Sequence, residues 1–230
     1  MITQQITNSL DQYWNEVYSG GFLYSKKPSE AIKRALKFLE SNRLMNSEVI
    51  FLEFGFDYCQ DIIYASRKLN GTTCYGTDMS SQGLKLVSTL LEESGHSNEK
   101  IKIVEEDAFA FVERFPFQQA IPNLIFSHYF LQILKANDRD RMLEKTSLSE
   151  YSTNDSRFGI GDEVEHNTFV LYPEAPLQTI HFFSPDELLR IQSKHNCDML
   201  HLEEYVEHKS VRGSPINFKT WLTILRKETR

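Results

Sequence analysis

From residue 48 to residue 128 the chain alternates short apolar runs with helical patterns, and this alternation constrains its fold more than any other feature. Val49–Phe54 is apolar except for Glu53, as expected of a central parallel strand that is buried on both faces. Strands that alternate with helices at this pace form βαβ units and a parallel sheet. The sequence therefore predicts an α/β, doubly wound (Rossmann-like) domain.

The predicted elements follow one another closely. Apolar positions at helical spacing predict a helix over residues 5–18, and a second helix opens at Pro28-Ser29-Glu30. One face of that second helix carries Ala31, Ile32, Ala35, Leu36 and Leu39. The predicted strands are Val49–Phe54, Thr72–Thr77, Ile101–Val104 and one that begins at Leu124–Phe126, and the helices between them are Ile62–Leu69, Gln82–Leu91 and Ala108–Phe115.

The last third of the chain has a different pattern. Residues 146–169 are polar and are predicted to be irregular, and the short interval before them leaves room for only a short helix. Ser184-Pro185 then opens a helix that runs through Ile191, because Ser can cap a helix and Pro suits its first position. Met199–Val206 and Thr220–Leu225 read as a closing hairpin. The whole chain therefore predicts a seven-stranded, mostly parallel sheet with an antiparallel closing hairpin.

Composition excludes several classes of protein. The chain has 230 residues, which suits one domain, and its net charge of −7 argues against general nucleic-acid binding. Its apolar runs are too short to span a bilayer, and its first residues lack the pattern of a signal peptide. The three cysteines form no CxxC pair. We expect a cytoplasmic protein with neither a nucleic-acid nor a membrane partner.

Polar residues follow each predicted strand of the parallel half. They are Glu53 to Gly55, Asp78, Glu106 to Ala108, and Ser127 to Tyr129. Ligands of doubly wound sheets bind outside the carboxyl ends of the strands, where these residues would lie. Asp78 follows Gly55 by about the spacing at which a carboxylate accepts from both ribose hydroxyls, although an acidic residue there can also simply cap a helix.

The first strand is followed by neither phosphate-binding motif. A dinucleotide site needs G-x-G-x-x-G and a triphosphate site needs G-x-x-x-x-G-K-[ST], but here only Gly55 is present and no Lys or Arg follows before Arg67. The nucleotide that still fits is an adenosine without phosphates, as in S-adenosylmethionine.

Four segments resemble the motifs of the class I S-adenosylmethionine-dependent methyltransferases: LEFGFDYCQD, CYGTDMS, VEEDAFAF and IPNLIFSHYFLQIL. STNDSRFGIGDEVEHNTF and IHFFSPDELLRI resemble small bacterial members near the tellurite-resistance and thiol methyltransferases. The resemblance covers nearly the whole chain and implies one domain. Its parts would be a helical cap (1–45), a cofactor-binding half (46–135), and an acceptor-side loop with the closing hairpin (136–230).

The resemblance also implies roles for individual residues. Glu53 and Gly55 would face the methionine end of the cofactor, Asp78 the ribose, and Asp107 the adenine. The full set implied to bind S-adenosylmethionine is Glu53, Gly55, Asp57, Asp78, Met79, Asp107, Ala108 and Ser127. His128 is the first candidate for a general base and His166 the second, whereas Tyr13, Trp14, Tyr18 and Tyr129 would line the acceptor pocket or its lid. Either histidine, and any of these aromatics, could instead only pack or cap.

The chain departs from the family pattern in its first loop, where Asp57 and Cys59 stand in place of glycines. Three functions therefore remain open: methyl transfer to a small molecule, methyl transfer to a peptide or protein, and a non-catalytic binding protein that has lost the donor site. Ser152–Phe183 is predicted to act as a lid over the acceptor. His195, His201 and His208 match no metal-binding spacing, so no metal is expected.

Overall fold

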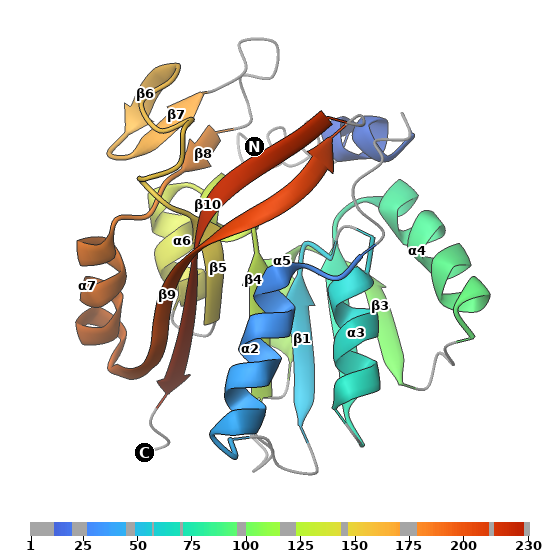
Figure 1. Cartoon of the computed structure of the whole chain (residues 1–230). Coiled ribbons are helices and arrows are strands. Elements are labelled where there is room, and N and C mark those ends of the chain that lie inside the picture. Colours follow the sequence, from blue (N-terminus) through green and yellow to red (C-terminus); the bar gives the residue numbers. More distant parts are fainter. Residues whose placement is uncertain are drawn as a thin grey trace. The chain divides into compact units, whose positions relative to one another are not determined.

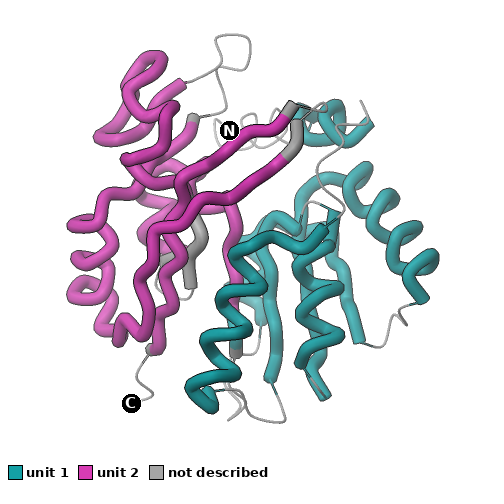
Figure 2. Tube along the Cα trace, in the orientation of Figure 1, with its two compact units in different colours: residues 1–124, 210–214 teal, residues 125–209, 215–230 magenta. Residues whose placement is uncertain are grey.

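The structure is a computed structural model. It describes residues 12–19, 27–44, 49–56, 58–69, 71–95, 100–115, 123–143, 147–170, 179–211 and 214–227. The chain divides into two compact units (Figure 2). Unit 1 contains residues 1–124 and 210–214, and unit 2 contains residues 125–209 and 215–230.

The strands confirm the predicted fold class (Figure 1). A seven-stranded sheet has the order β3-β2-β1-β4-β5-β10-β9. Its strands are β1 (Ile50–Phe54), β2 (Thr73–Asp78), β3 (Ile101–Glu105), β4 (Asn123–His128), β5 (Ser147–Tyr151), β9 (Cys197–Val211) and β10 (Ser214–Lys227). The fold is α/β, doubly wound and mostly parallel, and β9 and β10 supply the closing hairpin.

Unit 1 is built on three parallel strands in register. β1 pairs with β2 from Ile50↔Thr73 to Phe54↔Thr77, and β2 pairs with β3 up to Asp78↔Glu105. Phe51, Leu52 and Phe54 are fully buried, which is why this strand reads as a continuous apolar run. Because the strands are parallel and in register, the residues that follow their carboxyl ends all lie at one edge of this unit.

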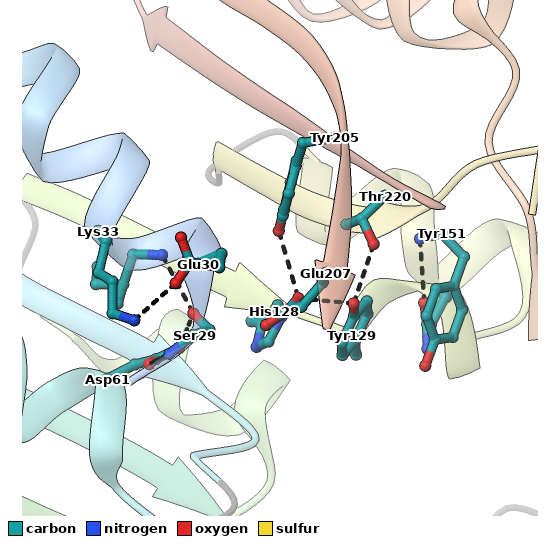
Figure 3. Close-up of polar contacts among 12 residues, drawn as sticks. Ser29, Glu30, Lys33, Asp61, His128, Tyr129, Tyr151, Tyr205, Glu207 and Thr220 are labelled. Carbon is teal, nitrogen blue, oxygen red and sulfur yellow. Dashed lines mark hydrogen bonds and ion pairs between the residues drawn. The ribbon is translucent and has the colours of Figure 1, made fainter. Parts of the chain in front are cut away.

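The labelled helices of unit 1 are α2 (Glu30–Ser41), α3 (Gln60–Lys68), α4 (Ser81–Glu93) and α5 (Ala108–Arg114). All but α3 begin at a polar side-chain cap. Ser29, Ser80 and Asp107 are the N-caps of α2, α4 and α5, and each accepts from a backbone N–H of its helix. The five residues predicted to lie on one face of α2 are all buried. α2 and α3 pack against each other, and Asp61 of α3 accepts from the backbone N–H and the hydroxyl of Ser29, both at 2.6 Å (Figure 3).

In unit 2 the strand pairing of the sheet changes from parallel to antiparallel. β4 and β5 are parallel, whereas β5 and β10 are antiparallel from Thr220↔Tyr151 to Thr223↔Leu148. The helical elements are the 3₁₀ turn η1 (Leu131–Ile133), α6 (Ala136–Leu143) and α7 (Pro185–His195). Ser184 caps α7 and a Pro occupies its first turn, as predicted.

The prediction that residues 146–169 are irregular is wrong. This stretch contains β5, and a second sheet is formed by β6 (Asp162–Glu165), β7 (Thr168–Val170) and β8 (Thr179–His181) in the order β6-β7-β8. The turn between β6 and β7 contains Asn167 with a φ of 59°, a conformation that Asn tolerates better than most residues. β6 is mostly exposed, so no apolar alternation marked it in the sequence. Part of the predicted lid, residues 171–178, lies outside the described residues.

Gly76 provides a test of core packing in unit 1. A Cβ atom there would lie 2.9 Å from Phe56, 3.0 Å from Ile103 and 3.1 Å from Ile62, so Gly76→Ala should lower the free energy of unfolding by about 1–3 kcal/mol. The control is Gly83→Ala in α4, where the three atoms nearest the added methyl group all belong to the ring of Tyr18 and alanine favours the helix by about 1 kcal/mol. Urea unfolding should therefore give Gly76→Ala a much lower free energy of unfolding than Gly83→Ala. Equal free energies of unfolding would contradict this packing.

Candidate functional site

The loop after β1 has the backbone geometry of a glycine-rich turn. Gly55 has a φ of 63°, and its N–H donates to the carbonyl of Thr77 on β2 at 3.0 Å. Cys59, which stands where the family has a glycine, has a φ of 59° and is the N-cap of α3. A residue with a Cβ pays about 1–2 kcal/mol for this conformation. The loop therefore keeps a conformation suited to glycine even where glycine is absent, whereas Asp57 lies outside the described residues.

Asp78 ends β2, and its side chain is not the N-cap of the following helix. Its Oδ1 accepts from the backbone N–H of Ser80 at 2.9 Å, while Ser80 itself caps α4 by accepting from Gly83. Its Oδ2 accepts from the hydroxyl of Tyr18 at 3.4 Å, which is near the upper limit for a hydrogen bond. Asp78 is therefore not the N-cap residue of α4, although one of its oxygens holds the backbone of the residue that is.

The helix of residues 12–19 lies over this strand end in unit 1. Asn15 Oδ1 accepts from the hydroxyl of Ser80 at 2.8 Å and from the backbone N–H of Gln82 at 3.1 Å. Tyr18, three residues later on the same helix face, contacts Asp78 and packs edge-on against Tyr58 with ring centroids 6.2 Å apart. The structure thus brings Tyr18 and Asp78 together, and Asn15 holds the same helix to the start of α4.

Tyr13 and Trp14 extend this aromatic group along the helix. The rings of Tyr13 and Trp14 meet edge to face with their centroids 5.2 Å apart. The ring centroids of Trp14 and Tyr18 are 6.4 Å apart. The structure therefore gathers the three aromatics predicted for the lid on one element. Their helix begins at residue 12 among the described residues, so residues 5–11 of the predicted helix lie outside them.

The other predicted cofactor residues lie at or near strand ends. Glu53 is buried in β1 opposite Gly76, and its charge adds to the burial that raises the pKa of the Cys74 thiol to about 12. Asp107 caps α5 through Oδ1, which accepts from the N–H groups of Phe109 and Ala110. Ala108 is buried at the start of α5, Met79 is half-buried after β2, and Ser127 is fully buried in β4.

A buried carboxylate in unit 2 collects three donors on one oxygen. Glu207 Oε2 lies 2.8 Å from the hydroxyl of Tyr129, 3.0 Å from His128 Nε2 and 3.4 Å from the hydroxyl of Tyr205 (Figure 3). The hydroxyl of Thr220 lies 3.0 Å from that of Tyr129. Because Tyr129 donates to the carboxylate, Thr220 must donate to Tyr129. The network therefore joins the end of β4 to both strands of the closing hairpin.

The protonation states in this network follow from burial and charge. Burial would raise the pKa of Glu207, but the charge and hydrogen bond of His128, the charge of Lys209 and the hydroxyl of Tyr129 together hold it well below its usual range. Burial raises the pKa of Tyr129 well above its ordinary value, and the neighbouring Tyr151 and Glu207 add to this rise. Glu207 is therefore an anion and Tyr129 a neutral donor at neutral pH. Tyr129 also has a φ of 59°, an uncommon conformation of the kind that clusters at functional sites.

His128 belongs to a stack of planar rings. Its ring centroid lies 4.0 Å from that of Tyr129, which lies 4.3 Å from that of Tyr151. Two cations cover this stack. Lys209 Nζ lies 4.3 Å from the ring centroid of Tyr129, and the guanidinium carbon of Arg157 lies 3.8 Å from that of Tyr151.

The sequence analysis singled out His128 and Tyr129 but not Glu207, the carboxylate that both contact. The sequence carried no signal for it. Tyr205 and Glu207 both point inward from one strand, but the apolar Val206 between them is exposed, so hydropathy would have predicted the opposite orientation. His166, the second candidate base, is an exposed residue of the turn between β6 and β7.

In the described part of the chain, no group of three or more His, Cys, Asp or Glu side chains could hold a metal ion. Among the same residues, no helix has the length and apolar character needed to cross a membrane.

The comparison with solved structures decides the fold family. A SAM-dependent methyltransferase from Anabaena variabilis ATCC 29413 superposes with a TM-score of 0.65, covering 97% of this chain and 95% of that one at 11% identity. The chain has the class I methyltransferase fold. No family model matches the chain, and no curated protein is significantly similar to it in sequence.

Two further structures with this methyltransferase fold are similar. One is the 1,6-didemethyltoxoflavin-N1-methyltransferase of Burkholderia thailandensis with its substrate and S-adenosylhomocysteine bound (TM-score 0.57, 11% identity, 86% of this chain and 79% of that one). The other is TehB from Haemophilus influenzae (TM-score 0.54, 15% identity, 84% and 62%). At these identities the similarity shows the fold alone.

Glu207→Gln tests the role of the buried carboxylate in stability. At pH 7 this change should lower the free energy of unfolding by about 1.5–3 kcal/mol, the usual range for hydrogen bonds to a charged group. The pKa of Glu207 is lower in the folded than in the unfolded state, so its stabilisation is present above the unfolded pKa of about 4.3 and is lost as the pH falls toward the folded value. Urea unfolding of both proteins at decreasing pH should show the difference shrinking.

The matched control is Glu203→Gln on the same strand. Glu203 also pairs with a histidine, His201, at 3.2 Å, but its side chain is 35% exposed. This change should alter the free energy of unfolding by less than about 1 kcal/mol. Equal effects of the two substitutions would contradict the buried network.

Proposed function

We propose that the chain is an S-adenosylmethionine-dependent methyltransferase that acts on a small molecule. The observation that carries this proposal is Asp78, a carboxylate at the end of β2 whose helix is capped by another residue, Ser80. A carboxylate offers two acceptor oxygens to the two hydroxyls of a ribose. The class I fold supplies the context, since ligands of such sheets bind at the carboxyl ends of their strands.

The residues of unit 1 fit an adenosine-type cofactor. Gly55 has no side chain and a left-handed φ, so a ligand can approach its backbone closely. The Tyr18 hydroxyl is only weakly held by Asp78 at 3.4 Å, so a ribose hydroxyl can replace it. Asp107 uses Oδ1 to cap α5, and its carboxylate is the proposed acceptor for the adenine amino group.

When bound, the cofactor would supply a methyl group on a positively charged sulfur. A nucleophile would attack the methyl carbon in line with the carbon–sulfur bond, and the sulfur would leave. The protein's part is then to hold the nucleophile and the methyl group in near-attack geometry. Tyr13, Trp14 and Tyr18 would exclude water from the strand end, where the hydroxyl of Tyr18 already contacts Asp78 and the other two rings pack beside it along the helix. Where the acceptor carries a proton, His128 is the proposed base.

A small acceptor is favoured over the alternatives. The Burkholderia thailandensis enzyme with this fold is a methyltransferase of a small molecule, and the proposal transfers that class of acceptor to this chain. Methyl transfer to a peptide or protein remains the alternative activity. The non-catalytic alternative rests on the lost glycines, but Cys59 keeps the left-handed conformation that its position requires.

Asp78→Ala tests the proposed ribose contact. Isothermal titration with S-adenosylhomocysteine should show binding to the wild type and a loss of about 1.5–3 kcal/mol of binding free energy in the variant, since hydrogen bonds to a charged group are lost. The control is Glu105→Ala, which removes an exposed carboxylate from the register partner of Asp78 on β3 and should leave binding unchanged. Absence of binding to the wild type would support the non-catalytic alternative, and unchanged binding by Asp78→Ala would remove the assigned role.

A further inference from the structure

Asn15 joins the helix of residues 12–19 to the start of α4 in unit 1. Its Oδ1 accepts from the hydroxyl of Ser80 at 2.8 Å and from the backbone N–H of Gln82 at 3.1 Å. Gln82 is the second residue of α4, and the N–H groups in the first turn of a helix have no partner within the helix. Asn15 therefore supplies an acceptor that the backbone of α4 needs.

Ser80 connects this attachment to the carboxylate that is proposed to hold the ribose. Its hydroxyl donates to Asn15 and accepts from the N–H of Gly83 at 3.0 Å, while its own N–H donates to Asp78 Oδ1 at 2.9 Å. Ser80 is fully buried, which strengthens these hydrogen bonds. Asn15 and Asp78 thus contact the same residue, and the helix of residues 12–19 and the carboxylate are held in a fixed relation.

Tyr18 is held on the same helix by the packing of its ring. The ring lies edge-on to that of Tyr58, with centroids 6.2 Å apart, and a Cβ atom at Gly83 would lie only 3.0 Å from it. The hydroxyl donates to Asp78 Oδ2 at 3.4 Å, which is longer than the usual O–H···O distance of about 2.5–3.0 Å. The ring can therefore stay in place when a ligand takes over the contact of the hydroxyl with Asp78.

A ribose can compete for this carboxylate without removing the helix. Asp78 and Tyr18 are both half-buried, so the carboxylate is partly accessible beside the ring. A carboxylate has about four acceptor positions, and a ribose offers two hydroxyl donors where Tyr18 offers one. The long contact of Tyr18 is thus the one that a ribose would displace, whereas the shorter contacts of Asn15 would remain.

We propose that Asn15 is a positioning residue of the donor site. It keeps the helix of residues 12–19 on α4 while the ribose displaces only the Tyr18 hydroxyl from Asp78, so the ring of Tyr18 forms a fixed side of the cofactor site. The proposal rests on the S-adenosylmethionine binding proposed above. The competing arrangement is a helix that must leave the strand end before the cofactor binds, and it predicts the opposite effect when the contacts of Asn15 are lost.

The attachment can be measured without a ligand. Amide hydrogen exchange of the full chain should show the Gln82 N–H protected, and Asn15→Ala should raise its exchange rate about tenfold, since one hydrogen bond is lost. Asn15→Asp keeps a side-chain oxygen and should keep the protection. So should Gln12→Ala, which removes only an exposed contact with Glu16 at 3.2 Å on the same helix. Equal exchange of this N–H in the wild type and Asn15→Ala would overturn the proposal.

Calorimetric titration with S-adenosylhomocysteine tests the direction of the effect. Asn15→Ala should weaken binding by about 3- to 10-fold, because the helix beside the ribose is no longer held. Asn15→Asp should restore the wild-type affinity, and the control Gln12→Ala should not change it. Stronger or unchanged binding by Asn15→Ala would mean that the helix hinders the cofactor or plays no part, and either result would overturn the proposal.

The hydroxyl of Tyr18 gives an effect of the opposite sign. Tyr18→Phe keeps the ring and should strengthen binding of S-adenosylhomocysteine about threefold, because the ribose no longer displaces a donor. Contacts that depend on one another give non-additive effects, so the same change in the Asn15→Ala background should alter the affinity less than about 1.5-fold. Weaker binding by Tyr18→Phe, or a full threefold gain in both backgrounds, would overturn the proposal.

The outcomes separate this inference from the proposed function. Binding of S-adenosylhomocysteine by the wild type with an unchanged affinity in Asn15→Ala would remove only the role of Asn15. Failure of the wild type to bind S-adenosylhomocysteine would reject the proposed function, and with it the donor site that Asn15 is proposed to position.

Discussion

Parallel, in-register pairing of β1, β2 and β3 is the constraint on which the candidate donor site depends. It brings Gly55 and Asp78, which are 23 positions apart in the sequence, to one edge of unit 1. The N–H of Gly55 even donates to the carbonyl of Thr77, the neighbour of Asp78. The loops at this edge can therefore diverge in sequence while the strand ends keep their positions, and Cys59 is an example of such divergence.

Unit 2 depends on a different interaction, the ionised carboxylate of Glu207. An anion that is 2% exposed is costly unless donors satisfy it, and His128, Tyr129 and Tyr205 do so on a single oxygen. Such a network holds side chains from several strands in one arrangement. The same contacts hold the imidazole of His128, the proposed base, beside Glu207.

The sequence predicted most of unit 1 because β1 is buried on both faces and because α2, α4 and α5 begin at polar caps. Val49–Phe54 and the helix that begins at Glu30 were found within a residue or two for this reason. The strands of residues 146–170 were missed, since they are three to five residues long and β6 is exposed. Asp78 and His128 could be proposed as site residues because they end strands, whereas the contacts of Asn15 with Ser80 and Gln82 are tertiary and no local pattern records them.

A crystal structure of the full chain with S-adenosylhomocysteine tests the central claim most directly, because the claim concerns where the cofactor lies. The account predicts that the ribose hydroxyls donate to the carboxylate of Asp78, in place of Tyr18, and that the adenine lies beside Asp107. A ribose bound away from Asp78, or crystals that never take up the ligand, would contradict it.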